Sequence, residues 1–583
     1  MAAAVVFLGA AADAAPAESS GYERRMVDRA LAELGRRVDP SPFGKRIRTI
    51  YIVAGDIIAP DDPYPRLLNV VHVTTRDEVI HRELLFAEGE VWDPARVAET
   101  ERNLRSLFIL ALARIVPLDT GEPGTVDVLV ATRDLWSIRF NSSFNVAGSL
   151  LQFLRIRPTE QNLLGFGKQL SGDFELRLDT LGFGQEYVDR RVFGTHLLFG
   201  ERARLFFNRA TGALEGSEGL MQLGRPLFSL QTEWGFETTV AWDQRRVRLF
   251  RGADIEALTA ADGEPVPWIY DRRELEATAL YTRSFGADFK WNVSAGAGAY
   301  AHAYRPPEEE VLTPAQRALL EAEILPISED AAYAKVQLHA FSPTYRVLRN
   351  VESFARSEDY QVGPGVRAEL RAGGLWDGHA PGVEPFIEAG ASAHYREVLG
   401  DSLLAVSAGA STRVCPEGCP RDGATWVNQR FAAELLFVTQ TIGPGRFALR
   451  GLYEAHRREL DRRVVLLGGG NGLRGAPPEL LAGDRMGLVN FEYRTLPLEV
   501  LTLHLGAVAF YDVGTVFSGA GPPTQTAGVG LRLLFPQFDV EPIRIDFGYV
   551  LAGGANPRPA DRLSSSFGQV ERYRPAFLDA PLQ

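Results

Sequence analysis

Apolar and polar residues alternate along most of the chain after Trp136. Phe174, Leu176 and Leu178, for example, alternate with charged residues. The same period of two returns in other segments, among them 233–242, 289–297, 366–371, 447–454 and 501–509. A period of two is typical of a β-strand with one apolar face, and many of these runs reach about ten residues, roughly twice the usual strand length of a globular protein. The pattern predicts a mainly β region over 140–583.

Two architectures account for such alternation. Strands of stacked soluble β-sandwiches also alternate. A closed antiparallel barrel in a bilayer instead needs about 9–11 residues per tilted strand, apolar outside and polar inside, because lipid offers no hydrogen-bond partner to an open edge. The long runs, the aromatic residues at their ends and the charges in the polar phase favour the membrane barrel. At about 28 residues for each strand and its connection, this region would hold about 16 strands.

The chain before Trp136 mixes helical and strand periods. Apolar residues recur at helical spacing over 22–38, which predicts a short helix within a linker formed by 18–44. From 45 to 139 the order is strand, helix, helix, strand, strand. This order predicts a small α+β domain, with a sheet that carries both helices on one face.

Local signals place the two helices of this domain. The segment from Thr75 to Glu78 has the form of a capping box, in which the threonine hydroxyl serves an unpaired amide of the first turn. Asp93 followed by Pro94 predicts the N-cap and the first residue of the second helix. The last two strands are expected over 110–118 and 125–131, joined as a hairpin.

Residues 1–17 have the composition of a secretory signal peptide. An unbroken small and apolar run is followed by two Ala-x-Ala sites, although no basic residue precedes Arg24. We expect export at this signal. No later window approaches the 18 or so uninterrupted apolar residues that a helical membrane span requires.

Charge and cysteine content narrow the function classes. The 62 basic residues are outnumbered by 74 acidic residues, which argues against a nucleic-acid partner. Cys415 and Cys419 are the two cysteines of the chain. They could form a small disulfide loop or half of a zinc site. No second Cys or His pair lies nearby to complete four ligands, so the disulfide is favoured and no metal is expected.

Glycine-rich motifs give no support for a cofactor. The segment 470–475 fits the dinucleotide pattern G-x-G-x-x-G, but Pro477 and Pro478 block the helix that would have to follow it. The segment 162–168 lacks the spacing and the hydroxyl of a phosphate loop. No catalytic serine or zinc-binding histidine motif is present, so we expect no enzyme activity, no catalytic residue and no cofactor.

Several segments carry a family resemblance. The segment 468–475 (GGGNGLRG), followed by Gly483 and by 490–494 (NFEYR), resembles the signature of the BamA/TamA/FhaC superfamily of outer-membrane assembly and transport proteins. The segment 160–167 is similar to the entrance of the barrel in that family, and 510–514 and 542–548 are similar to its late strands. The region 45–139 resembles a POTRA domain, apart from a long insertion at 54–73. The resemblance implies a surface-antigen-type barrel of sixteen strands with a loop that folds inward.

The resemblance also implies a site. Its inward-loop motif corresponds to Gly472, Leu473, Arg474 and Gly475. Because apolar Val489, Phe491 and Tyr493 would face lipid, Glu492 between them would face the lumen, and Asp512 does so by the same argument. The resemblance supplies Arg474 as their partner, since a guanidinium fork bonds carboxylates with a geometry that lysine cannot match. Alternatively, the two carboxylates simply face water.

The resemblance implies a function in handling other polypeptides. The chain would assemble or translocate unfolded clients at the bacterial outer membrane, in contact with lipid and with periplasmic or lipoprotein accessory proteins, and its N-terminal domain would lie in the periplasm. The alternatives are a passive porin or structural barrel, and an enzyme with a barrel anchor. The segment 564–577 departs from the family because it is a poorly alternating closing strand.

Overall fold

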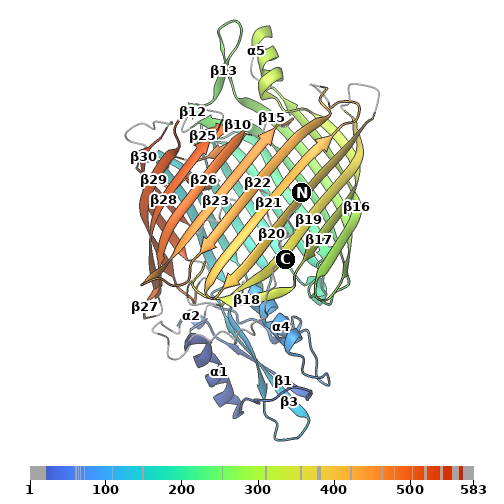
Figure 1. Cartoon of the computed structure of the whole chain (residues 1–583), viewed down its shortest axis with the longest axis vertical. Helices are drawn as coiled ribbons and strands as arrows, with labels where there is room; N and C mark the ends of the chain where they lie inside the picture. The colour runs from blue at the N-terminus through green and yellow to red at the C-terminus, as the bar shows by residue number, and fades with distance from the viewer. Residues whose placement is uncertain are drawn as a thin grey trace, which may run out of the picture.

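The computed structural model describes residues 21–568 except for short gaps at 59–61, 63–64, 66, 71, 108, 148–149, 252–253, 309–311, 353, 355–356, 377–382, 420–422, 461–463, 478, 502, 518–520, 539–541 and 554–562. The expected signal peptide, 1–17, and the segment 569–577 of the expected closing strand lie outside this part. A large β-barrel stands above a small α/β domain (Figure 1).

Antiparallel strands close into one ring. Within the described residues the ring contains 20 strands: β4 (Ile138–Ala147), β5 (Leu150–Glu160), β6 (Gln169–Leu176), β7 (Thr180–Asp189), β8 (Leu198–Asn208), β9 (Leu214–Arg225), β10 (Trp234–Arg248), β15 (Ile269–Phe285), β16 (Lys290–Arg305), β17 (Glu329–Phe341), β19 (Glu358–Trp376), β20 (Glu384–Leu399), β21 (Ser402–Val414), β22 (Trp426–Val438), β23 (Gly445–Arg457), β26 (Arg485–Thr495), β28 (Leu503–Val516), β29 (Thr524–Leu534), β30 (Ile543–Ala552) and β31 (Leu563–Gly568). Short β18 (Thr344–Leu348) and β27 (Leu498–Val500) extend its edge.

The strand number exceeds the expected sixteen or so. The prediction of about 16 strands assumed about 28 residues for each strand and its connection, and several connections are much shorter than this assumes. β20 ends at Leu399 and β21 begins at Ser402, while β6 ends at Leu176 and β7 begins at Thr180. Connections of two or three residues leave room for additional strands in the same length of chain.

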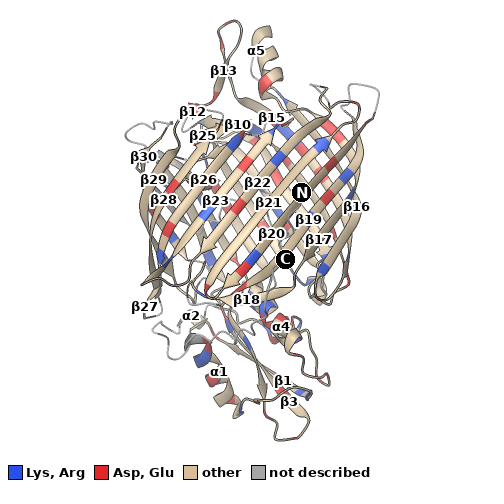
Figure 2. Cartoon of the chain, viewed as in Figure 1, with Lys and Arg blue, Asp and Glu red and all other residues tan. Residues whose placement is uncertain are grey.

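The barrel strands expose their apolar side chains and bury their polar ones, which is the reverse of a water-soluble protein. On β26, Val489 and Phe491 are 46% and 45% exposed, whereas Asn490 and Glu492 between them are 8% exposed. Charged residues lie along many of the barrel strands (Figure 2). The apolar phase therefore covers the outside of the ring and the polar phase fills its inside, which is the arrangement that hydrocarbon surroundings require.

The small domain is a three-stranded sheet in the order β1-β3-β2 (β1, Arg46–Gly55; β2, Leu110–Leu118; β3, Thr125–Asp134). β1 is parallel and β2 antiparallel to β3. Its helices are α1 (Gly21–Leu34), α2 (Leu67–Val70), α3 (Asp77–His81) and α4 (Pro94–Ser106). Residues of α3 and α4 pack on one face of the sheet, as expected, and Met26 and Ala30 of α1 pack on the other face.

Of the two helix starts predicted from the sequence, the structure confirms the one at Asp93 and not the one at Thr75. Asp93 accepts hydrogen bonds from the amides of Ala95 and Arg96 and so caps α4, as expected. The capping box at Thr75 is wrong, because α3 starts at Asp77 without a side-chain cap. The Thr75 amide instead donates to Asp134, and its hydroxyl accepts a hydrogen bond from Asn162 of the barrel.

Short elements stand at the barrel end away from the domain. They are β11 (Phe250–Arg251), β12 (Asp254–Ile255), β13 (Ala257–Thr259), β14 (Pro265–Pro267), α5 (Pro314–Leu319) and η3 (Leu320–Ile324). β13 and α5 project beyond the rim (Figure 1), and Val266, Leu320 and Ile324 belong to one buried cluster there. The one-turn helices η1 (Leu163–Gly165) and η2 (Val192–Gly194) lie in connections near the domain. In the described part of the chain, no helix has the length and apolarity to cross a membrane.

Candidate functional site: an arginine loop inside the barrel

The connection between β23 and β26 forms a compact loop. It contains β24 (Val465–Leu467), η4 (Gly469–Asn471) and β25 (Leu481–Gly483), and β24 pairs with β25. Leu467, Leu473 and Ala476 are fully buried in a cluster that includes inward residues of β26. Burial of these apolar side chains fixes the loop against the barrel wall, in a lumen that is otherwise polar.

Arg474 at the tip of this loop meets both carboxylates that the alternation directed inward. Its Nε and Nη2 donate to the two oxygens of Asp512 at 2.9 and 2.8 Å, and its Nη1 donates to Glu492 Oε2 at 2.6 Å. The Arg474 amide also donates to Asp512 at 3.1 Å. A single guanidinium thus joins β26 and β28 to the loop, with the two-bond geometry that favours arginine over lysine.

The surroundings complete this contact. The Arg474 guanidinium lies 4.0 Å from the centre of the Phe510 ring. Arg494 forms a second ion pair with Glu492. Asn490 donates to the carbonyl of Gly472 at 2.7 Å. Two carboxylates therefore face two guanidinium groups, and this balance of charge is what a buried ionic cluster needs to be stable.

Glycine is required where the loop turns. Gly472 and Gly475 have φ values of 113° and 84°, a region that side chains disfavour. A Cβ on Gly475 would lie 2.7 Å from the backbone of Gly548 on β30, and a Cβ on Gly548 would lie 2.5 Å from Gly475. The motif residues thus serve three contacts: Leu473 is buried, Arg474 binds carboxylates, and Gly475 allows a close approach to β30.

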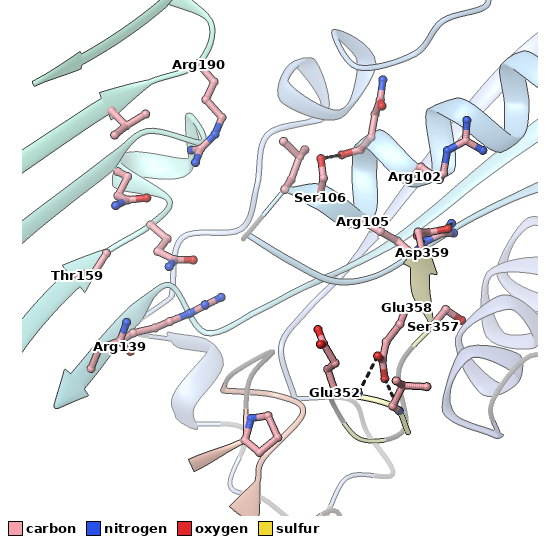
Figure 3. A pocket seen from close by; sticks show the side chains of 18 of the residues that line it. Arg102, Arg105, Ser106, Arg139, Thr159, Arg190, Glu352, Ser357, Glu358 and Asp359 are labelled. Carbon is pink, nitrogen blue, oxygen red and sulfur yellow. Dashed lines mark hydrogen bonds and ion pairs between the residues drawn. The ribbon is translucent and has the colours of Figure 1, made fainter. Parts of the chain in front are cut away.

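A chamber of about 1970 Å³ lies between the loop, the barrel wall and α4. Arg474 lines it on the loop, Glu492 and Arg494 line it on β26, and Arg102 and Arg105 line it on α4. Figure 3 shows α4 with Arg102 and Arg105 on one side of this space and Arg139 and Arg190 of the barrel on the other. The domain therefore covers the barrel mouth.

Ion pairs hold the domain at this mouth. Arg105 of α4 donates to both oxygens of Asp359 at 2.9 and 2.8 Å. Further contacts are Arg191 to Glu83 at 2.5 Å, Arg349 to Glu23 at 2.9 Å, and the Arg76 guanidinium 3.9 Å from the Phe166 ring centre. These contacts between the domain and the barrel were not identified from the sequence. Their partners lie as far apart as 326 positions and leave no periodic signal.

The remaining candidate residues lie elsewhere. Cys415 and Cys419 form a disulfide directly after β21, in a buried cluster with Phe386 and Val427. Within the described residues, no group of three or more His, Cys, Asp or Glu side chains is arranged to hold a metal ion.

Comparisons with known proteins complete the description. No protein-family model and no curated protein matches the chain. Among solved structures, CdiB from Acinetobacter baumannii matches 90% of this chain and 73% of its own length, with 12% identity and a TM-score of 0.38. BamA from Haemophilus ducreyi lacking POTRA domains 1–3 matches 94% and 92%, with 12% identity and a TM-score of 0.34. CdiB from Escherichia coli matches 91% and 80%, with 11% identity and a TM-score of 0.41.

Because identities are near 12% and TM-scores are below 0.5, we draw no functional conclusion from these similarities.

Proposed function

We propose that this chain is an outer-membrane protein that inserts or translocates other polypeptides, with a POTRA-like domain in the periplasm. Its clients would be unfolded chains, met at the periplasmic mouth together with accessory proteins. The observation that carries the proposal is the short seam of the barrel. In the described residues β31 and β4 share four residue pairs, 564–567 with 144–147, whereas β4 and β5 share ten.

Within the described residues this seam has the fewest residue pairs of the ring, since β5 and β6 share five and β30 and β31 share six, so it should open at the lowest cost. Each backbone hydrogen bond broken inside lipid leaves a donor and an acceptor without water, so a seam with few pairs is where the ring separates first. Edges exposed in this way would bind an incoming strand by the same main-chain bonds. The barrel would thereby provide a template for a client strand without reading its side chains.

The α/β domain offers a second edge. The first half of β1 is covered, since the Ile47 amide donates to the Glu90 carbonyl and the Gly89 amide to the Ile47 carbonyl. The Ile50 amide donates to the Glu88 side chain. By alternation, Ile52 and Ala54 direct their backbone groups outward, and in the described part of the chain they have no backbone partner on that side. An extended client could pair there.

The opposite edge of the sheet is less suited to docking. On β2, the Ile115 amide is already bonded to Glu101 Oε1 at 2.6 Å, and Pro117 has no amide hydrogen to offer. The Pro117 carbonyl accepts from the Asp39 amide. Bulges, prolines and side-chain caps of this kind prevent edge pairing. Client docking is therefore assigned to the second half of β1.

A reversible lock on the seam tests the proposal. Residues 145 and 566 are paired across the seam, so Asn145→Cys with Ser566→Cys would join β4 to β31 by a disulfide. We expect the oxidised cells to lose correctly folded outer-membrane or surface proteins, and the reduced cells to regain them. The control is Ala509→Cys with Val529→Cys, which joins the well-paired β28 and β29. If locking the seam changes the outer-membrane proteome no more than the control does, the proposal is wrong.

A further inference from the structure

The chamber beneath the Arg474 loop carries an uneven charge. Its lining includes sixteen Lys or Arg and ten Asp or Glu residues, although the whole chain has a net charge of −12. Many of these cations are matched by carboxylates in or behind the wall, as Arg155 is by Asp173 and Arg450 is by Glu434.

Within the part of the chain that the structure describes, three cations near α4 have no hydrogen bond or ion pair to a carboxylate. Lys290 donates to the Leu230 carbonyl at 2.7 Å. Arg225 lies 4.0 Å from the Trp234 ring centre and donates to the Trp234 carbonyl. Arg102 lies 4.3 Å from the ring centre of Tyr345. Aromatic rings and carbonyls hold these side chains in place while leaving donor groups available.

The connection 226–233 contacts two of these cations, Arg225 and Lys290, and also contacts α4, which carries Arg102. Asn103 of α4 donates to the Phe228 carbonyl at 3.1 Å, and the Leu230 amide donates to Glu99 at 2.5 Å. Leu230 also accepts the bond from Lys290. Glu99 is the carboxylate that interacts electrostatically with Lys290, and it keeps its charge although one of its oxygens accepts the Leu230 amide. Among the described residues named here, three cations thus stand against one carboxylate, so positive charge predominates where α4, this connection and β16 meet.

The charges of this region also act on a neighbouring group outside the strands. Burial lowers the pKa of His196, and the charges of Arg191 and Arg225 lower it further. An enclosed space with low-dielectric walls and an excess of one sign concentrates counter-ions, and multivalent ones most strongly.

We propose that this part of the chamber binds a multivalent phosphate-bearing anion, supplied either by a soluble phosphate compound or by the headgroup of an anionic lipid. Arg102, Arg225 and Lys290 would contact the phosphate oxygens, since charged donors form their strongest hydrogen bonds to anionic oxygens. The site lies between the domain and the barrel, so a bound anion would stabilise the docked position of α4.

Binding of inorganic tripolyphosphate to the full-length protein in a zwitterionic detergent tests this directly, by titration calorimetry at low and moderate salt. We expect saturable binding to one site that weakens as salt rises. The double variant Arg102→Gln with Arg225→Gln should weaken it by about tenfold or more. The matched control, Arg283→Gln with Arg485→Gln, removes two cations that do not line the chamber and should change affinity by less than about twofold.

Absence of saturable binding, or equal losses in the two double variants, would overturn the proposal. The source of the anion is separated by repeating the titration in nanodiscs of phosphatidylcholine and of phosphatidylglycerol. Weaker tripolyphosphate binding in phosphatidylglycerol supports a lipid headgroup as the occupant, and equal binding supports a soluble compound. The assay contains no client, so its failure leaves the seam proposal intact.

Discussion

Arg105, in the last turn of α4, forms two hydrogen bonds to Asp359, in the second position of β19, although 254 positions separate them in the sequence. The side chains are 14% and 18% exposed. This pair links the α/β domain to the barrel. Since it is largely shielded from water, it is a specific contact that fixes how the domain sits on the mouth.

Removing this pair should loosen the domain. Arg105→Gln leaves Asp359 partly buried without its cation, and we expect a loss of about 1–3 kcal/mol in docking free energy. Hydrogen exchange at α4 should rise while exchange in the barrel strands stays constant. A double-mutant cycle with Asp359→Asn isolates the pair, because the second change should then add little. Full additivity of the two changes would contradict the assignment.

Removing the Arg474 side chain should free the loop. Arg474→Ala leaves Asp512 and Glu492 without their shared partner, at a cost of about 3–5 kcal/mol to the docked loop. Proteases should then cut within 468–484, activity should fall, and the barrel should still shift its gel mobility on heating. Arg474→Lys should restore the protease resistance of the loop and the activity only in part, because an ammonium cannot bond both carboxylates in the same geometry. Unchanged protease resistance and activity would refute this role.

The close contact between Gly475 and Gly548 gives a steric prediction. Gly475→Ala places a methyl group 2.7 Å from the backbone of β30 in a left-handed conformation, so the loop must shift. We expect a destabilisation of about 1–3 kcal/mol and faster proteolysis of the loop. Gly470→Ala is the matched control, since no atom lies within 4 Å of its added Cβ. Equal effects of the two substitutions would argue against the contact.

The outward apolar phase predicts unequal tolerance of charge. Val529 on β29 is 61% exposed on the apolar side, and Ser294 on β16 belongs to the inward polar phase. Val529→Lys should destabilise the barrel in lipid by about 2–4 kcal/mol near the midplane, whereas Ser294→Lys should be tolerated. Urea titrations of folding into vesicles measure both. A similar loss at the two positions would mean that the outer face does not contact hydrocarbon.

The sequence predicted local features better than long-range ones. The two-residue period predicts an inward direction for Glu492 and Asp512, since side-chain direction follows from strand alternation alone, and both side chains contact Arg474 in the structure. The strand number was underestimated because the lengths of connections leave no periodic trace. Thr75 was assigned to a helix cap, yet its hydroxyl bonds to Asn162 of the barrel. Such a tertiary contact overrides a local signal and can be seen only once the chain has folded.

Single-channel conductance tests most directly whether the lumen is closed by the Arg474 loop. The full-length protein and a variant lacking 468–484 would be inserted in planar bilayers, after heat-shifted gel mobility has shown that both are folded. We predict small or rare openings for the full-length protein and large, persistent openings for the variant. Equal, large conductance in both would contradict a loop that closes the barrel and would identify an open porin instead.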